Sequence, residues 1–231
     1  MMLLACNTLE ALWRYTDELH DKRYPDHDLR PILGNGKTLK PDVMFVFINP
    51  TARNVSTSRT WRGPRFPFIG TRQVWRIFHR AGLVDDLLMR RIEESPSEWS
   101  LELTQEVLAF LRRKRFYVTN IVKWAGHDAA LPDKEKINLF LPILEREIAV
   151  VRPAYVVAFG LIPFEALTQE DILLKQYHSQ AMRTRQLQFY SRRFGTVQTK
   201  IIPCYFPIGR GDPKKAVDLL RLLPSKRFAK R

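Results

Sequence analysis

The chain has 231 residues, of which 45% are hydrophobic, which allows one sizeable core and argues against an intrinsically disordered protein. Its 38 lysines and arginines exceed its 24 aspartates and glutamates, so the net charge is +14. This excess favours a polyanionic partner such as nucleic acid, because neutralised phosphates release counterions. We expect no membrane span, since no apolar run approaches the roughly 20 residues that a transmembrane helix needs.

The hydrophobic pattern predicts helices and strands that alternate along the chain. The expected helices begin with an amphipathic one that contains Leu9, Leu12 and Leu19 and continue over 71–82, 83–94, 101–112, 138–151, 161–167 and 213–223. The expected strands cover 43–48, 116–122, 155–159 and 200–204. This alternation predicts an α/β fold with three α/β/α layers around a central, mainly parallel four-stranded sheet.

The chain shows few signs of further division. We expect a single domain over residues 1–225, with a polar, arginine-rich insertion over 169–198 and a basic tail over 226–231. The first residues are too few and too uncharged for a signal peptide. Residues 51–70 form a long connection, and connections of this length inside a compact domain are usually functional or disordered.

The chain offers little for a metal or cofactor site. Cys6 and Cys204 are its only cysteines, so they cannot form a four-thiolate zinc or iron–sulfur site. His20, His27 and His79 have no ligand-like spacing with them. We therefore expect no metal and no cofactor. Two cysteines also fit a reducing compartment, the cytoplasm, or the nucleus if the organism is eukaryotic.

Asn49 follows an apolar, β-prone run, Val43 to Ile48, and Pro50 ends the strand. In an open α/β sheet, ligand sites lie at the carboxyl ends of the strands, so Asn49 is expected at the mouth of a cleft. A carboxamide both donates and accepts hydrogen bonds and could orient a water or contact a polar ring. Phe68, in Phe66-Pro67-Phe68, could stack on that ring.

Four motifs in order resemble the uracil-DNA glycosylase superfamily. Ile48-Asn49-Pro50 and Phe66-Pro67-Phe68 resemble motifs of the mismatch-specific uracil and thymine glycosylases, and so does Tyr117 to Lys123, YVTNIVK. Val156 to Gly160 follows the same family pattern, and Phe68-Ile69-Gly70 also resembles the thermostable uracil-DNA glycosylases. Those thermostable enzymes hold an iron–sulfur cluster with four cysteines, which this chain lacks. A second motif, which begins with His or Asn in relatives, begins here with Phe206.

The resemblance implies a monofunctional DNA glycosylase that removes uracil or a related deaminated base by flipping it out of the helix. Asn49 and Asn120 are the expected catalytic residues, with Asn49 positioning the attacking water. The base would contact Ile48, Phe68, Gly70 and His127. The expected DNA contacts are Arg59, Arg62, Lys123, and a wedge formed by Ile208, Gly209 and Arg210. We expect a monomer that acts on damaged or mismatched, double-stranded DNA.

Two other hypotheses stay open. A glycosylase fold could bind DNA or a modified base without cleaving it, which the replacement by Phe206 favours. An α/β domain could instead bind a nucleotide or another small anion. The chain lacks the glycine-rich phosphate loops that nucleotide-binding domains commonly carry, which weighs against this last hypothesis.

Overall fold

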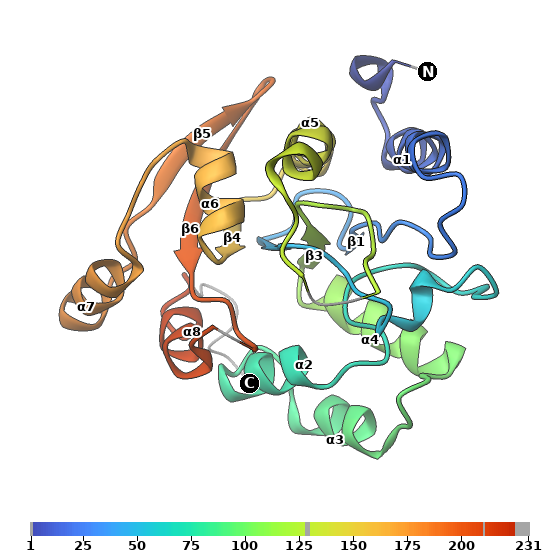
Figure 1. Cartoon of the computed structure of the whole chain (residues 1–231). Coiled ribbons are helices and arrows are strands. Elements are labelled where there is room, and N and C mark those ends of the chain that lie inside the picture. Colours follow the sequence, from blue (N-terminus) through green and yellow to red (C-terminus); the bar gives the residue numbers. More distant parts are fainter. Residues whose placement is uncertain (1, 128–129, 210, 225–231) are drawn as a thin grey trace.

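The structure is a computed structural model that describes residues 2–127, 130–209 and 211–224. The predicted tail over 226–231 and Arg210 lie outside the described residues. A central sheet separates two layers of helices (Figure 1), so the predicted three-layer α/β/α architecture is confirmed.

The sheet contains six strands in the described residues, in the order β1-β3-β2-β4-β6-β5. The parallel centre consists of β3 (Phe116–Asn120), β2 (Val43–Phe47), β4 (Tyr155–Phe159) and β6 (Val197–Cys204). These are the four predicted strands. Two antiparallel edge strands, β1 (Asn35–Gly36) and β5 (Tyr190–Phe194), complete the sheet.

The prediction of a four-stranded sheet is therefore wrong, because these two edge strands were not predicted. Strand β1 has only two residues, too few for a hydrophobic period, and it lies in a glycine-containing stretch that resembles a connection. Strand β5 has the polar sequence YSRRF and lies in the segment predicted as an insertion. That segment also contains α7 (Leu174–Thr184). It therefore extends the sheet rather than adding a separate feature.

The helices pack on both faces of the sheet. One face is covered by α2 (Gln73–Arg80), α3 (Asp86–Glu94), α4 (Leu101–Arg113), α7 and α8 (Pro213–Leu220). The other face is covered by α1 (Leu9–Arg23), α5 (Lys134–Val151) and α6 (Leu161–Thr168). Short 3-10 turns occur at Leu3–Ala5 and Val55–Thr57.

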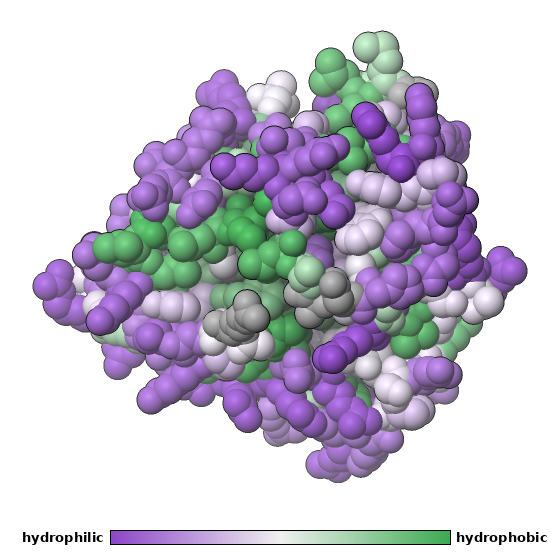
Figure 2. All heavy atoms as spheres, viewed as in Figure 1, coloured by the Kyte–Doolittle hydropathy of each residue, from purple (hydrophilic) through white to green (hydrophobic). Residues whose placement is uncertain are grey.

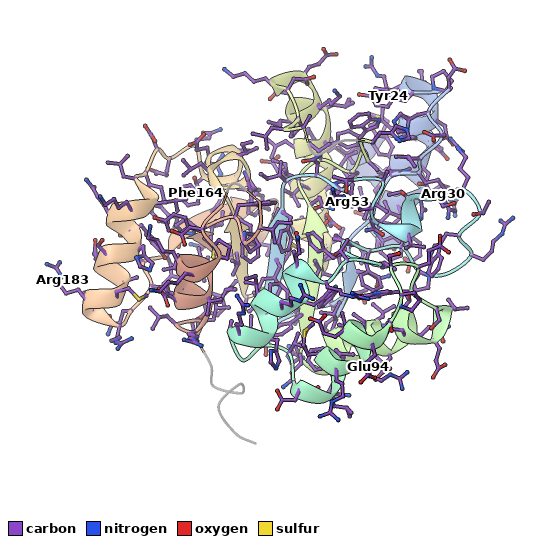
Figure 3. The ribbon with its side chains drawn as sticks, turned by 60° about the horizontal axis from the view of Figure 1, so that its bottom comes forward. Tyr24, Arg30, Arg53, Glu94, Phe164 and Arg183 are labelled. Carbon is purple, nitrogen blue, oxygen red and sulfur yellow. The ribbon has the colours of Figure 1, made fainter. Side chains whose placement is uncertain are left out.

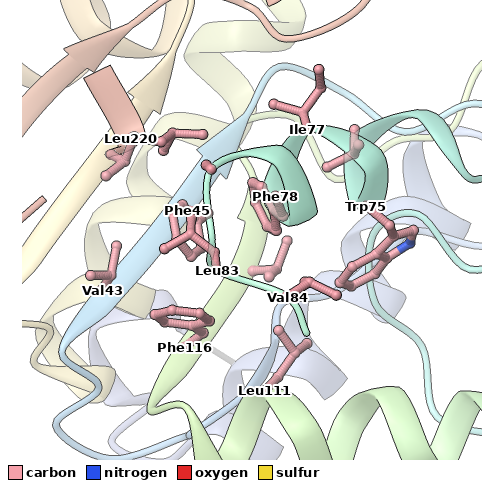
Figure 4. Packing of buried hydrophobic residues seen from close by; sticks show 14 of the residues in the cluster. Val43, Phe45, Trp75, Ile77, Phe78, Leu83, Val84, Leu111, Phe116 and Leu220 are labelled. Atoms are coloured by element: carbon pink, nitrogen blue, oxygen red, sulfur yellow. The ribbon is translucent and has the colours of Figure 1, made fainter. Parts of the chain in front are cut away.

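The alternation of side chains along β2 forms the two cores. Phe45 faces the first layer, where its ring lies 4.7 Å from that of Phe78 and 5.2 Å from that of Phe116 (Figure 4). Met44 and Val46 face the second layer. Because both faces are covered, every residue of β2 is buried, as expected for a central parallel strand.

Helix starts follow their capping residues more closely than the apolar pattern. Helix α3 begins at Asp86 rather than at residue 83, because Asp85 accepts a hydrogen bond from Leu88 N at 2.9 Å. Helix α5 begins one turn before residue 138, where Asp133 caps Lys136 N. Thr71, the predicted cap of α2, instead donates its hydroxyl to Phe68 O.

The surface agrees with the basic, polar composition. Hydrophilic residues form most of the periphery in Figure 2, and hydrophobic residues gather toward its middle. None of the described helices combines the length and apolar character that crossing a membrane requires. Cys6 and Cys204 are free and buried on opposite sides of the sheet, so they do not share a site.

Candidate active site

A cleft of about 1600 Å³ opens where β2 and β3 end. It is bounded by the connection that follows β2 and by the turn that follows β6. Most of the predicted site residues lie along it: Ile48, Asn49, Arg59, Arg62, Phe68, Gly70, Asn120, His127 and Ile208. The structure thus brings residues from segments far apart in the sequence onto one cavity.

Asn49 is half-buried directly beyond the end of β2. Its Nδ2 donates to Pro50 O and to Ala130 O, both at 3.4 Å. These contacts use the donor side of the carboxamide, so Oδ1 is the atom that could accept a hydrogen bond from a water in the cleft.

Asn120 is the last residue of β3 and lies next to Phe47 in the register of the sheet. The residue is 1% exposed, yet neither Oδ1 nor Nδ2 has a hydrogen-bond partner in the described part of the protein. Buried polar groups are nearly always paired, because leaving one unpaired costs free energy. The unpaired carboxamide of Asn120 lines the cleft, where it is available to form hydrogen bonds with a ligand.

Phe68 is the aromatic residue of the Phe66-Pro67-Phe68 motif that lines the cleft, whereas Phe66 is fully buried. Its ring meets that of Phe47 edge to face, with 4.5 Å between centroids. The backbone of Phe68 has a positive φ of 71°, which is unusual for a residue other than glycine. Trp75 stabilises this conformation by donating its indole N–H to Phe68 O at 3.0 Å.

Gly70 completes the turn, and only glycine fits there. Its φ is +85°, and an added Cβ would lie 2.5 Å from Ser97 O. This close approach places the stretch Ser97–Trp99 in the wall of the cleft.

The long connection after β2 is held by side chains rather than by regular structure. Arg30 donates to Ser58 O at 2.9 Å and to Trp61 O at 2.6 Å, and Arg65 forms a two-pronged ion pair with Asp17 on α1. Asn54 is buried and donates to Phe66 O at 2.8 Å. Figure 3 shows Arg30 on the side of the molecule where α1 lies.

The cleft wall carries more positive than negative charge. Arg53, Arg59, Arg62 and Arg72 line it, against the carboxylates of Asp28 and Glu98 among the described lining residues. Arg53, Arg59 and Arg62 are exposed. Their guanidinium groups could contact phosphates, which position nucleic acid without depending on sequence.

Lys123 lies elsewhere, and the expectation that it contacts DNA is wrong. Its side chain is buried and pairs with Glu147 at 2.6 Å. Its Nζ also donates to the Thr119 hydroxyl at 2.5 Å and to Asn120 O at 2.7 Å. Burial lowers the pKa of Lys123, and the Glu147 carboxylate opposes that shift. Lys123 therefore supports the peptide of Asn120 from inside the protein.

His127 is exposed at the rim of the cleft, where its Nε2 lies 2.8 Å from Asp28 Oδ1. The hydrogen bond with His127 lowers the pKa of Asp28. The imidazole is thus oriented by the carboxylate of Asp28, a contact that no local pattern predicts, because the two residues are 99 positions apart.

The turn after β6 closes the other side of the cleft. Phe206 and Ile208 line it, and Phe206 lies 6.5 Å from Phe47 between ring centroids. Gly209 is exposed and has a φ of +60°. Only glycine fits at position 211, because an added Cβ would lie 1.8 Å from Phe206 O. The predicted wedge thus begins at the cleft, although its Arg210 lies outside the described residues.

Several lining residues were missed by sequence reasoning. Asp28 and Glu98 lie in short connections between helices or strands, and nothing in their local pattern indicates a site. Arg72 was assigned only to a helix. The arginine content of the connection after β2 was the available signal for Arg53.

The fold and cleft agree with two comparisons to known proteins. The family model of the uracil DNA glycosylase superfamily matches residues 33–219. The chain therefore belongs to this superfamily, as its motifs predicted. It is also similar to a type-4 uracil-DNA glycosylase from Pyrobaculum aerophilum, with 28% identity over 108 residues. That match covers 46% of this chain and 53% of the relative, so it spans about half of each protein.

Proposed function

We propose that this protein is a DNA glycosylase that hydrolyses the N-glycosidic bond of uracil or a related deaminated base in DNA. The observation that carries the proposal is the convergence of Asn49, Phe68 and Asn120 on one cleft in a chain of the uracil DNA glycosylase superfamily. A base must leave the stack of the duplex to reach such a cleft, at a cost of a few kcal/mol.

In this proposal the extruded base lies between two contacts. The ring of Phe68 stacks on its face, a contact worth about 1–3 kcal/mol. The buried carboxamide of Asn120 then forms hydrogen bonds with the polar edge of the base, which would pair both of its atoms. Ile48 and Gly70 supply the neighbouring wall, and His127 lies at the rim.

Asn49 would orient the attacking water through Oδ1. A carboxamide is a poor base, so the reaction would depend on departure of the base from an oxocarbenium-like sugar rather than on proton abstraction. The nearby phosphates of bound DNA stabilise that cation, while the arginines of the cleft wall hold the backbone in place.

A direct assay tests the proposal. The protein is incubated with duplexes that contain uracil, hypoxanthine, xanthine or a thymine mismatch, and alkali then converts abasic sites into strand breaks. We expect breaks with at least one of these duplexes and far fewer with an Asn49→Ala variant. Breaks that do not exceed those of Asn49→Ala on any duplex would contradict the proposal.

A second candidate function is a module that binds the extruded base without cleaving it. Phe206 favours it, because relatives carry a polar His or Asn there and the Phe206 ring offers no hydrogen-bond donor to the departing base. Tight binding of uracil-containing DNA with no abasic product would select this function. A Phe206→His variant that gained glycosylase activity would show that the wild type lacks this activity because position 206 has no polar side chain.

A further inference from the structure

A three-residue cluster that includes His127 lies at the rim of the cleft, and the proposed reaction does not use it as a metal site. His27, Asp28 and His127 each offer a potential ligand atom, and these atoms lie within 4.8 Å of one another. Two of the residues follow α1 and the third follows β3, so the fold joins segments about a hundred residues apart. This separation is why the spacing of histidines and cysteines in the sequence indicated no metal site.

The imidazole of His27 is already oriented by residues outside the cluster, and that of His127 by Asp28 within it. The Nδ1 of His27 lies 3.2 Å from both the backbone O and the backbone N of Leu29, which leaves Nε2 as the ring nitrogen available to an ion, and the ring packs against Trp124 with 5.0 Å between centroids. The His127 ring lies 5.8 Å from that of His27. Backbone groups commonly orient metal-binding histidines in this way. Asp28 and His127 are exposed, so an ion can reach the cluster from solvent.

The donor set suits a particular class of ion. Two imidazoles and one carboxylate are typical ligands of Zn²⁺ and neighbouring transition metals, whereas Mg²⁺ and Ca²⁺ prefer oxygen ligands. The described residues contain two further histidine–aspartate contacts, His79–Asp86 at 2.7 Å and His178–Asp218 at 3.2 Å. Neither has a third ligand within reach in the described part of the chain.

We propose that His27, Asp28 and His127 bind one divalent transition-metal ion, with Zn²⁺ as the representative. The ion would replace the His127–Asp28 hydrogen bond and fix the segment after α1 to the segment after β3. Three protein ligands leave a coordination position open. Because Asp28 and His127 line the cleft, a phosphate oxygen of bound DNA could occupy that position.

The test measures metal binding and does not depend on glycosylase activity. Metal-free protein is titrated with Zn²⁺ by calorimetry and with Co²⁺ by visible absorption. We expect one ion per chain, and a loss of affinity of more than about tenfold in each of His27→Ala, Asp28→Asn and His127→Ala. The matched controls His79→Ala and His178→Ala remove histidines from the two-residue pairs and should bind as the wild type does.

A second readout guards against variants that lose affinity by unfolding. Zn²⁺ should raise the melting temperature of the wild-type protein, because an ion that binds only the folded state stabilises it. It should not raise that of His127→Ala, whose circular dichroism should match the wild type. Failure of the wild type to bind, or equal losses in the His79 and His178 controls, would overturn the proposal.

Discussion

Replacing Asn120 by alanine should separate activity from stability. In the free protein this buried carboxamide makes no hydrogen bond with the described residues, so the substitution breaks no such bond. Each buried, unpaired polar group costs about 1–3 kcal/mol. Removing the group should therefore offset the lost packing, and we expect the free energy of unfolding to change by less than about 1 kcal/mol or to rise.

Asn54 provides a matched control, because it is also a buried asparagine but is fully paired. Its Nδ2 donates to Phe66 O at 2.8 Å, and its Oδ1 accepts from Ser56 N at 3.0 Å and Ser56 Oγ at 2.9 Å. At about 0.5–1.5 kcal/mol for each of three bonds, Asn54→Ala should lose about 1.5–4.5 kcal/mol. For a domain of this size that loss lowers the melting temperature by about 3–18 °C.

Activity should follow a different pattern. If Asn120 forms two hydrogen bonds with the extruded base, their loss at about 1.4 kcal/mol each slows base release about 100-fold. Single-turnover base release and thermal melting, measured on the same preparations, test both statements. An Asn120→Ala protein that melts as early as Asn54→Ala, or that releases base at the wild-type rate, would refute the assignment of Asn120 as a ligand-binding group.

Three further predictions follow from individual contacts. Lys123→Met leaves Glu147 buried without its partner and should lower the free energy of unfolding in urea by about 3–5 kcal/mol. The double variant Lys123→Met with Glu147→Leu should recover most of that loss. A Lys123→Met variant as stable as the wild type would contradict the burial of this pair. Asp212→Ala should cost about 0.5–2 kcal/mol, because Asp212 caps α8. Contacts with Lys215 lower the pKa of Asp212 below its usual 3.8, so its carboxylate stabilises the protein above that pH. The difference in stability between the wild type and Asp212→Ala should vanish as pH falls through the lowered pKa. A stability difference that persists in acid would show that the charge of Asp212 is not its cause. Arg62→Gln should weaken DNA binding and flatten its dependence on salt by about one unit of slope, and an unchanged slope would show that Arg62 faces away from DNA.

The parallel centre of the sheet could be predicted because its strands are continuous apolar runs. Val43 to Phe47 is buried on both faces, so its sequence carries the signal directly. The edge strand β5 could not, because one of its faces is solvated and its sequence is polar. Register and edges depend on neighbours that are distant in the chain.

The placement of Asn49 and Phe68 along one cleft could be predicted for a similar reason, and the misplacement of Lys123 has the same origin. Asn49 and Phe68 stand at recognisable strand ends and turns. Lys123 was misplaced because a lysine in a basic chain suggests a phosphate contact, whereas its partner Glu147 lies on α5, 24 residues further along the chain. Asp28 joined the cleft only through the packing of α1 and its following segment.

The proposed glycosylase acts only on a base that has turned out of the duplex and entered the cleft. Fluorescence of 2-aminopurine placed beside uracil measures this directly, because the probe brightens when its neighbour leaves the stack. We predict brightening on binding of the wild-type protein to the uracil duplex and a much smaller change with Phe68→Ala, at protein concentrations that saturate both. Saturated binding of the wild type with no brightening would contradict the account.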